Sequence, residues 1–213
     1  RNLIIDNLPI LSAAIGMTVV IIAGQIDISI GSQFVVCGVI SGLAAKAGLP
    51  MPFVIVTTLA AGAFLGAING VLTARFGIPA IIATLATMVI LRNGLIRATD
   101  GDWIQDLPST YQWLGLGQAA AQPVYIILVA VFFAAAAWAL RSTAAGRSFY
   151  AVGCDHEAAR RVGLNPGTII LASFVLMGVL AAAASLFNFT RYPTIESNAG
   201  VGLELKVIAA VVV

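Results

Sequence analysis

The sequence predicts an all-α fold, a polytopic bundle of membrane-spanning helices. Of its 213 residues, 60% are hydrophobic and only 9% are charged, whereas a soluble domain carries about a quarter charged residues. The apolar residues form continuous runs instead of the alternating pattern of a membrane β-barrel. Because lipid offers the backbone no hydrogen-bond partners, each run is expected to be helical. We therefore expect one transmembrane domain over residues 1–213, with about six complete spans and a truncated seventh.

Glycine, proline and isolated basic residues divide the apolar runs into spans. In chain order we expect complete spans over residues 8–23, 33–45, 53–74, 80–96, 124–140 and 168–189. A seventh begins near Gly202 and ends in the run VIAAVVV, too short to cross a bilayer, which takes about 20 residues. Since the chain also starts at Arg1 without a methionine, we expect a fragment of a longer protein, truncated at both ends.

Basic residues in short loops predict which loops face the cytoplasm. The loop 141–167 contains four arginines and is therefore expected to be cytoplasmic. Alternation along the chain then places the loop 97–123, with its three aspartates, on the outer side, and the first span begins outside. Arg92 and Arg97 lie near a span end, where long basic side chains reach to the membrane interface.

Several functional classes are disfavoured by the residues present. A net charge of +2 without a basic stripe argues against a nucleic-acid partner. His156 is the only histidine, and Cys37 and Cys154 lack metal-site spacing, so we predict neither a metal site nor catalytic residues. An ion-coupled secondary transporter needs carboxylates deep in several spans, and Asp27 is the only candidate.

Small residues recur every four positions in the third predicted span, at Gly62, Gly66 and Gly70. This spacing lets two helix backbones approach closely in lipid. We interpret the three glycines as packing positions within one subunit, with a seam between two subunits as the alternative.

The stretch GQIDISIGS, residues 24–32, places a carboxylate between two apolar runs. An ionised Asp27 in hydrocarbon costs about 2.5–3.5 kcal/mol. Two interpretations stay open: a broken helix lining an aqueous pathway, or a polar turn at the cytoplasmic surface capped by Asp27 and Ser29. In the first, the translocation pathway is lined by Gln25, Asp27, Ser29 and, from the third span, Asn69. An intramembrane asparagine such as Asn69 more often forms a hydrogen bond between helices.

A short helix of about two turns is predicted in the cytoplasmic loop. Asp155 suits its N-cap, and Glu157 complements the helix dipole in the first turn. Arg160 and Arg161 suit the last turn, and Gly163 suits the C′ position. A helix this short is unstable alone, so we expect it to dock on a partner; an ordinary surface helix is the alternative.

Two motifs, in this order along the chain, resemble a known family. Residues 24–32 resemble the Gly-Gly-Ile-Asp-Leu-Ser-Val-Gly-Ser hallmark of ribose-, xylose- and galactose-type permeases, with Gln25 in place of the second glycine. AAGRSFYAVGCDHEAARRVGLN resembles the corresponding loop of the same permeases. Within it, Glu157-Ala158-Ala159 followed by Gly163 fits the Glu-Ala-Ala-x-x-x-Gly signature of binding-protein-dependent ABC importer permeases.

The resemblance implies a non-enzymatic, multi-pass permease subunit of the bacterial inner membrane that imports a monosaccharide or related sugar. Cytoplasmic ATP-binding subunits would bind ATP and Mg²⁺, so the chain itself needs no cofactor. A second permease copy or paralogue, a periplasmic sugar-binding protein and membrane lipid would be its other partners. The residues implied in coupling to the ATP-binding subunits are Asp155, Glu157, Ala158, Ala159, Arg160, Arg161 and Gly163. A secondary, ion-coupled transporter is the alternative function.

Overall fold

The computed structural model describes residues 3–212; the predicted domain also includes residues 1, 2 and 213, which lie outside this range. Among the described residues the regular elements are helices, and Ile104 and Ile195 form the one isolated β-bridge. The helices are α1 (Leu3–Ile22), α2 (Ile30–Lys46), α3 (Met51–Ala74), α4 (Ala80–Ala98), α5 (Gln118–Ser142), α6 (Ala144–Cys154), α7 (His156–Arg161), α8 (Pro166–Phe189) and α9 (Leu203–Val212), with a short 3₁₀ helix at Gln112–Gly115.

Five helices in the described part of the chain are long and apolar enough to cross a membrane: α1, α3, α4, α5 and α8. They correspond to five of the six predicted complete spans. The remaining one, predicted over residues 33–45, is α2. Its 17 residues extend about 25 Å, less than the hydrocarbon thickness of about 30 Å. The predicted start of a seventh span near Gly202 corresponds to α9.

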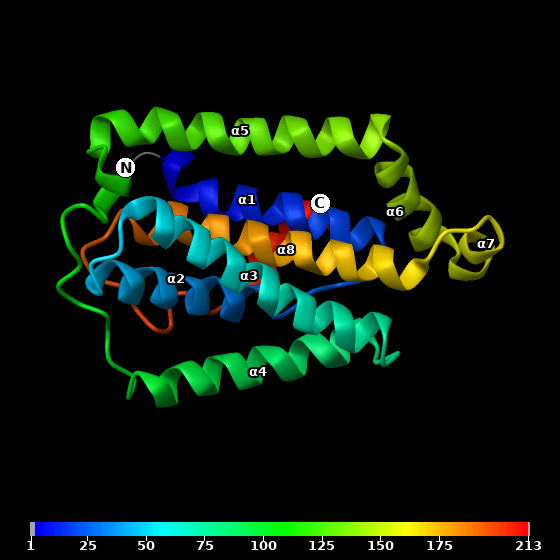
Figure 1. Ribbon diagram of the computed structural model, residues 1–213, viewed down its shortest axis with the longest axis horizontal. Helices are drawn as coiled ribbons and strands as arrows, with labels where there is room; N and C mark the ends of the chain where they lie inside the picture. Colours follow the sequence, from blue (N-terminus) through cyan, green and yellow to red (C-terminus); the bar gives the residue numbers. More distant parts are fainter. Residues whose placement is uncertain (1–2, 213) are drawn as a thin grey trace.

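The two longest connections of the bundle lie at its opposite ends (Figure 1). α6 and α7 form one end, and the segment between α4 and α5 forms the other. α1 begins at the same end as that segment. This arrangement agrees with the predicted alternation, in which the loops 141–167 and 97–123 face opposite sides of the membrane.

The most extensive helix pair among the described residues is α3 with α8, and glycine makes it possible. A Cβ atom at Gly62 would collide with the main-chain oxygen of Gly178, and one at Gly66 with that of Phe174. The third glycine, Gly70, lies against Leu171. The predicted face of small residues therefore packs within one subunit, as expected.

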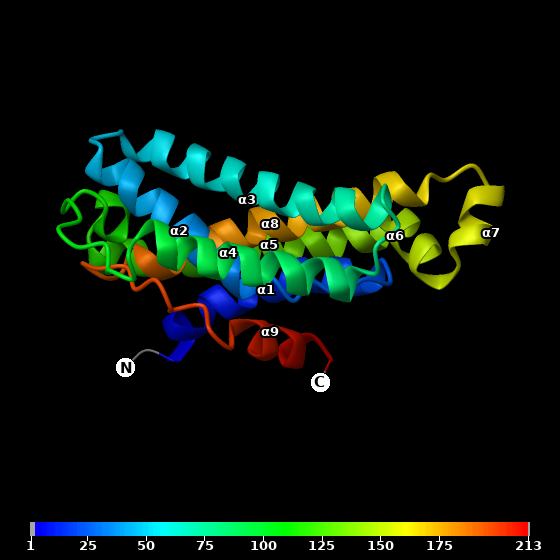
Figure 2. The ribbon, with the colours of Figure 1, turned by 90° about the horizontal axis from the view of Figure 1, so that it is seen from below.

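α2 and α9 both begin part-way along the length of the bundle, and α9 lies at its edge (Figures 1 and 2). Residues 23–29 run back from the end of α1 to the start of α2, and residues 190–202 connect α8 to α9. The start of α2 touches the segment just before α9. A Cβ atom at Gly31 would collide with the main-chain oxygen of Gly200, and a Cβ atom at Gly200 would collide with that of Gly31. From this point, here called the α2–α9 crossing, the two helices run in opposite directions.

The α3–α8 contact predicts a strong effect of adding a side chain at Gly66. We expect Gly66→Leu to lower the free energy of unfolding by about 3 kcal/mol, the upper end of the usual cost of overpacking. The new side chain would collide with main-chain atoms of Phe174, which cannot turn away as a flexible side chain can. Gly94→Leu in α4 is the matched control, since nothing lies within 4 Å of a Cβ atom there. Unfolding of the detergent-solubilised permease measures the difference, and equal stability of the two variants would contradict it.

Candidate functional site

α7 is a short helix whose two ends are closed by the predicted residues. Asp155 is the N-cap, and its Oδ1 accepts hydrogen bonds from the main-chain nitrogens of Glu157 (2.8 Å) and Ala158 (3.0 Å). Gly163 follows the helix with a φ of 85°, a conformation that favours glycine. Its N–H donates to the carbonyl of Arg160. The helix predicted from the capping residues is thus present.

The surface of α7 is mostly exposed and carries both charges of the motif. The side chains of Glu157, Arg160 and Arg161 are exposed, whereas Ala159 is buried against the rest of the chain. Val162, directly after the helix, is 74% exposed. α7 projects from its end of the bundle (Figures 1 and 2). It therefore presents charged groups and one apolar group to whatever lies beyond that end.

A second helix, α6, lies in the 141–167 loop before α7, where the sequence analysis made no prediction of secondary structure. Thr143 is its N-cap and accepts a hydrogen bond from the main-chain nitrogen of Gly146 (2.9 Å). Near its other end, Gly153 lies so close to the end of α1 that a Cβ atom would collide with the carbonyl of Ile22. The signal available in the sequence was Thr143, a residue type that favours the N-cap position, two residues after Arg141 at the end of the preceding span.

α6 thereby links α7 to the connection between α1 and α2. Gly153 is one residue before the end of α6, and a Cβ atom at Gly24 would make ordinary van der Waals contact with it. Only Asp155 separates α6 from α7. A displacement of α7 would therefore act on residues 23–29 through a short, closely packed helix.

Asp27 lies inside the bundle and is fully hydrogen-bonded by its neighbours. Its Oδ1 accepts from the main-chain nitrogen (2.8 Å) and the hydroxyl (2.6 Å) of Ser29, and its Oδ2 accepts from Nε2 of Gln33 (2.9 Å). Asn69 of α3 donates to the Ser29 hydroxyl at 2.7 Å. Thr87 of α4 donates in turn to Oδ1 of Asn69 at 2.7 Å. The network thus joins the start of α2 to α3 and α4.

The structure brings together three of the four predicted pathway residues: Asp27, Ser29 and Asn69. Each is almost completely buried, with at most 1% of its surface exposed. Gln25 lies two residues before Asp27 and is only partly buried. The sequence analysis missed Gln33, although its position four residues after Ser29 places both on one helical face.

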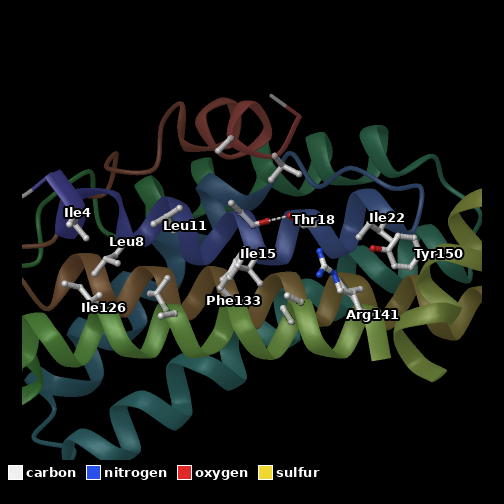
Figure 3. A pocket seen from close by; sticks show the side chains of 18 residues that line it. Ile4, Leu8, Leu11, Ile15, Thr18, Ile22, Ile126, Phe133, Arg141 and Tyr150 are labelled. Atoms are coloured by element: carbon white, nitrogen blue, oxygen red, sulfur yellow. Dashed lines mark hydrogen bonds between the residues drawn. The ribbon is translucent and has the colours of Figure 1, made fainter. Parts of the chain in front are cut away.

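The cavity drawn in Figure 3 lies elsewhere, between α1 and α5. It measures about 560 Å³, and among its 18 lining residues only Thr18, Arg141 and Tyr150 are polar. The Thr18 hydroxyl already donates to the carbonyl of Ala14 at 2.8 Å. None of the predicted pathway residues lines this cavity. So few polar groups give a hydroxylated solute little to bind.

Comparisons with known proteins agree with these features. Residues 2–213 match the model of the family described as "Branched-chain amino acid transport system / permease component". The chain is similar to the autoinducer 2 import system permease protein LsrC of Escherichia coli O9:H4 (strain HS), with 40% identity over 203 residues, 93% of this chain and 58% of that protein. The proteins of the same name from Shigella flexneri and Enterobacter sp. (strain 638) are 39% and 37% identical, with the same coverage.

The chain spans 58% of the length of the curated relatives it matches. No solved structure matches it. Because the family model covers all but the first residue, the chain belongs to the family of permease components of branched-chain amino acid transport systems.

Proposed function

We propose that the chain is part of the permease subunit of an ATP-driven importer in the bacterial inner membrane. The observation that carries the proposal is α7, a capped and exposed helix with the Glu157-Ala158-Ala159…Gly163 spacing, at one end of an apolar bundle. Cytoplasmic ATP-binding subunits would hold this helix. They would also bind ATP and Mg²⁺. A second permease copy or paralogue and a periplasmic binding protein would complete the transporter.

The proposed substrate is a monosaccharide of the pentose or hexose type, or a related sugar-like molecule. The relatives reported above are named as permeases of an autoinducer 2 import system, so autoinducer 2 belongs among the candidates. Uncharged polar side chains such as Ser29, Gln33 and Asn69 suit hydroxyl groups better than a strongly charged solute. We expect the binding protein, rather than this chain alone, to select among such solutes.

In the proposed mechanism, the ATP-binding subunits shift the permease between inward-open and outward-open states. A partner can shift such an equilibrium only if its contacts differ between the two states. The contacts of α7 would change, and α6 would pass the displacement to residues 23–29 through Gly153. The network of Asp27, Ser29 and Asn69 would then move with the start of α2. In this mechanism these three residues and Gln25 border the translocation pathway.

An ion-coupled secondary transporter is less well supported than an ATP-driven importer. Such a protein needs a carboxylate that takes up and releases a proton or cation in the membrane. Asp27 has both of its oxygens engaged by hydrogen bonds from Ser29 and Gln33. The exposed, capped α7 would also have no role in that mechanism.

Reversing the charge of Glu157 tests the role of α7. We expect Glu157→Lys to reduce ATP-driven solute uptake at least about tenfold, the equivalent of about 1.4 kcal/mol, because a charge at the contact with the ATP-binding subunit is reversed. Uptake and ATP hydrolysis by the full-length transporter in proteoliposomes are the measurements. Glu196→Lys is the matched control, since Glu196 is also exposed but follows α8. Normal uptake by Glu157→Lys would refute the assignment.

Removing the carboxylate of Asp27 tests the proposed pathway. Asp27→Ala leaves the donors of Ser29 and Gln33 without their acceptor, at about 1–3 kcal/mol for each buried unsatisfied group. We expect uptake to be lost while the permease still assembles with the ATP-binding subunits. Asp27→Asn preserves the side-chain size and separates the loss of charge from the loss of packing. Asp102→Ala, at an exposed site, is the control, and unchanged uptake by Asp27→Ala would contradict the proposal.

A further inference from the structure

Two opposite, partly buried charges lie near each other at the α2–α9 crossing. Arg92 belongs to α4, and Glu204 lies in the first turn of α9. Arg92 stands about 18 Å along α4 from its first residue and about 9 Å from its last, so its Cα lies within the span. The reach of Arg92 to the membrane interface stays a prediction, and the structure adds a partner: its Nη2 lies 3.9 Å from Oε1 of Glu204. Ionisable residues at such a depth are costly and are usually functional.

The pair is poorly satisfied for a structural ion pair. A distance of 3.9 Å exceeds the 2.7–2.9 Å typical of a charge-assisted hydrogen bond. Nη2 of Arg92 and Oε2 of Glu204 are buried, and neither has a hydrogen-bond partner among residues 3–212. The side chains are only 28% and 12% exposed, respectively. A buried pair held for stability alone would be expected to use its remaining donors and acceptors.

Further polar groups lie beside Arg92. A small cavity at the crossing is lined by Arg92 together with Ser32 of α2 and Ser197 and Asn198 of the segment before α9, and Glu204 is not among its lining residues. The hydroxyls of Ser32 and Ser197 already donate to the carbonyls of Met88 and Asp102. Main-chain atoms come close as well, because Gly31 and Gly200 touch. The cavity has a volume of about 10 Å³, which is the space of about one water molecule. A larger solute would therefore reach these groups only after α2 and α9 separate.

We propose that Arg92 and Glu204, with Ser32 and Asn198, form a binding site for adjacent hydroxyl groups of a polyhydroxylated solute. A hydroxyl both donates and accepts hydrogen bonds. Arg92 offers an unused donor and Glu204 an unused acceptor, so neighbouring hydroxyls can satisfy both. Closing the crossing without a solute restores the weak ion pair. This inference rests on the proposed function, to which it adds a specific site and the class of group that the site binds.

The decisive experiment replaces both charges by apolar side chains of similar length. Replacing a buried ion pair by well-packed apolar residues is often neutral or stabilising. Arg92→Met combined with Glu204→Met is therefore expected to fold and to assemble with the ATP-binding subunits. The full-length transporter, with its binding protein, is assayed in proteoliposomes for uptake of ribose, xylose, galactose and autoinducer 2. We expect the KM for the transported compound to rise at least about tenfold, the equivalent of about 1.4 kcal/mol.

The matched control is Arg97→Met combined with Glu196→Met, which removes the same two charges from exposed positions; we expect wild-type uptake. Wild-type KM in the variant of Arg92 and Glu204 would overturn the inference. If that variant does not assemble, Arg92→Lys decides the question, because it keeps the charge but shortens the donor. A raised KM for Arg92→Lys supports a solute contact, and an unchanged KM overturns it. Absence of uptake of all four compounds by the wild type would instead count against the proposed substrate class and not against the site.

Discussion

Residues 23–29 cross part of the bundle without forming a helix, and their polar groups must find partners inside the protein. Lipid supplies none, so irregular backbone at this depth has to be enclosed by other segments. The Asp27 carboxylate holds the main chain and hydroxyl of Ser29, and the Ile28 N–H donates to the Thr84 hydroxyl of α4. Asn69 adds the contact from α3. The placement of α2 thus depends on α3 and α4, and α3 is itself fixed by the glycine contact with α8.

This enclosed segment also lies on a continuous line of contacts between the two ends of the bundle. From the α7 end, the line runs through Gly153 of α6 to residues 23–29 and on to the α2–α9 crossing at Gly31 and Gly200. From there residues 190–202 lead to the opposite end, where Ile195 pairs with Ile104 in both directions at 3.0 Å. Several of these contacts are backbone against backbone. They bring the main chains of successive segments into direct contact along this line.

Local signals in the sequence were sufficient for five of the six expected complete spans, for the capping of α7 and for the glycine face of α3; the complete span expected over residues 33–45 was wrong, because α2 is too short to cross a membrane. Each depends on residues close together in the chain, such as Asp155 with the two nitrogens that it caps. The depth at which α2 begins could not be predicted in this way, because it depends on Asn69, some 40 residues away. The pair of Arg92 and Glu204 was missed for the same reason. Its position near the end of the predicted span made Arg92 resemble an ordinary basic residue at the membrane interface.

The short length of α2 also bears on how the protein enters the membrane. With about 25 Å of helix and Asp27 just before it, α2 is a poor independent substrate for insertion. Asn69, which donates to Oδ1 of Asp27 at 3.5 Å, belongs to α3, which emerges later from the ribosome. α2 and α3 are joined by only four residues, 47–50, and can enter lipid as one helical hairpin. The final position of α2 thus uses contacts with α3 and α4, both of which follow it in the chain.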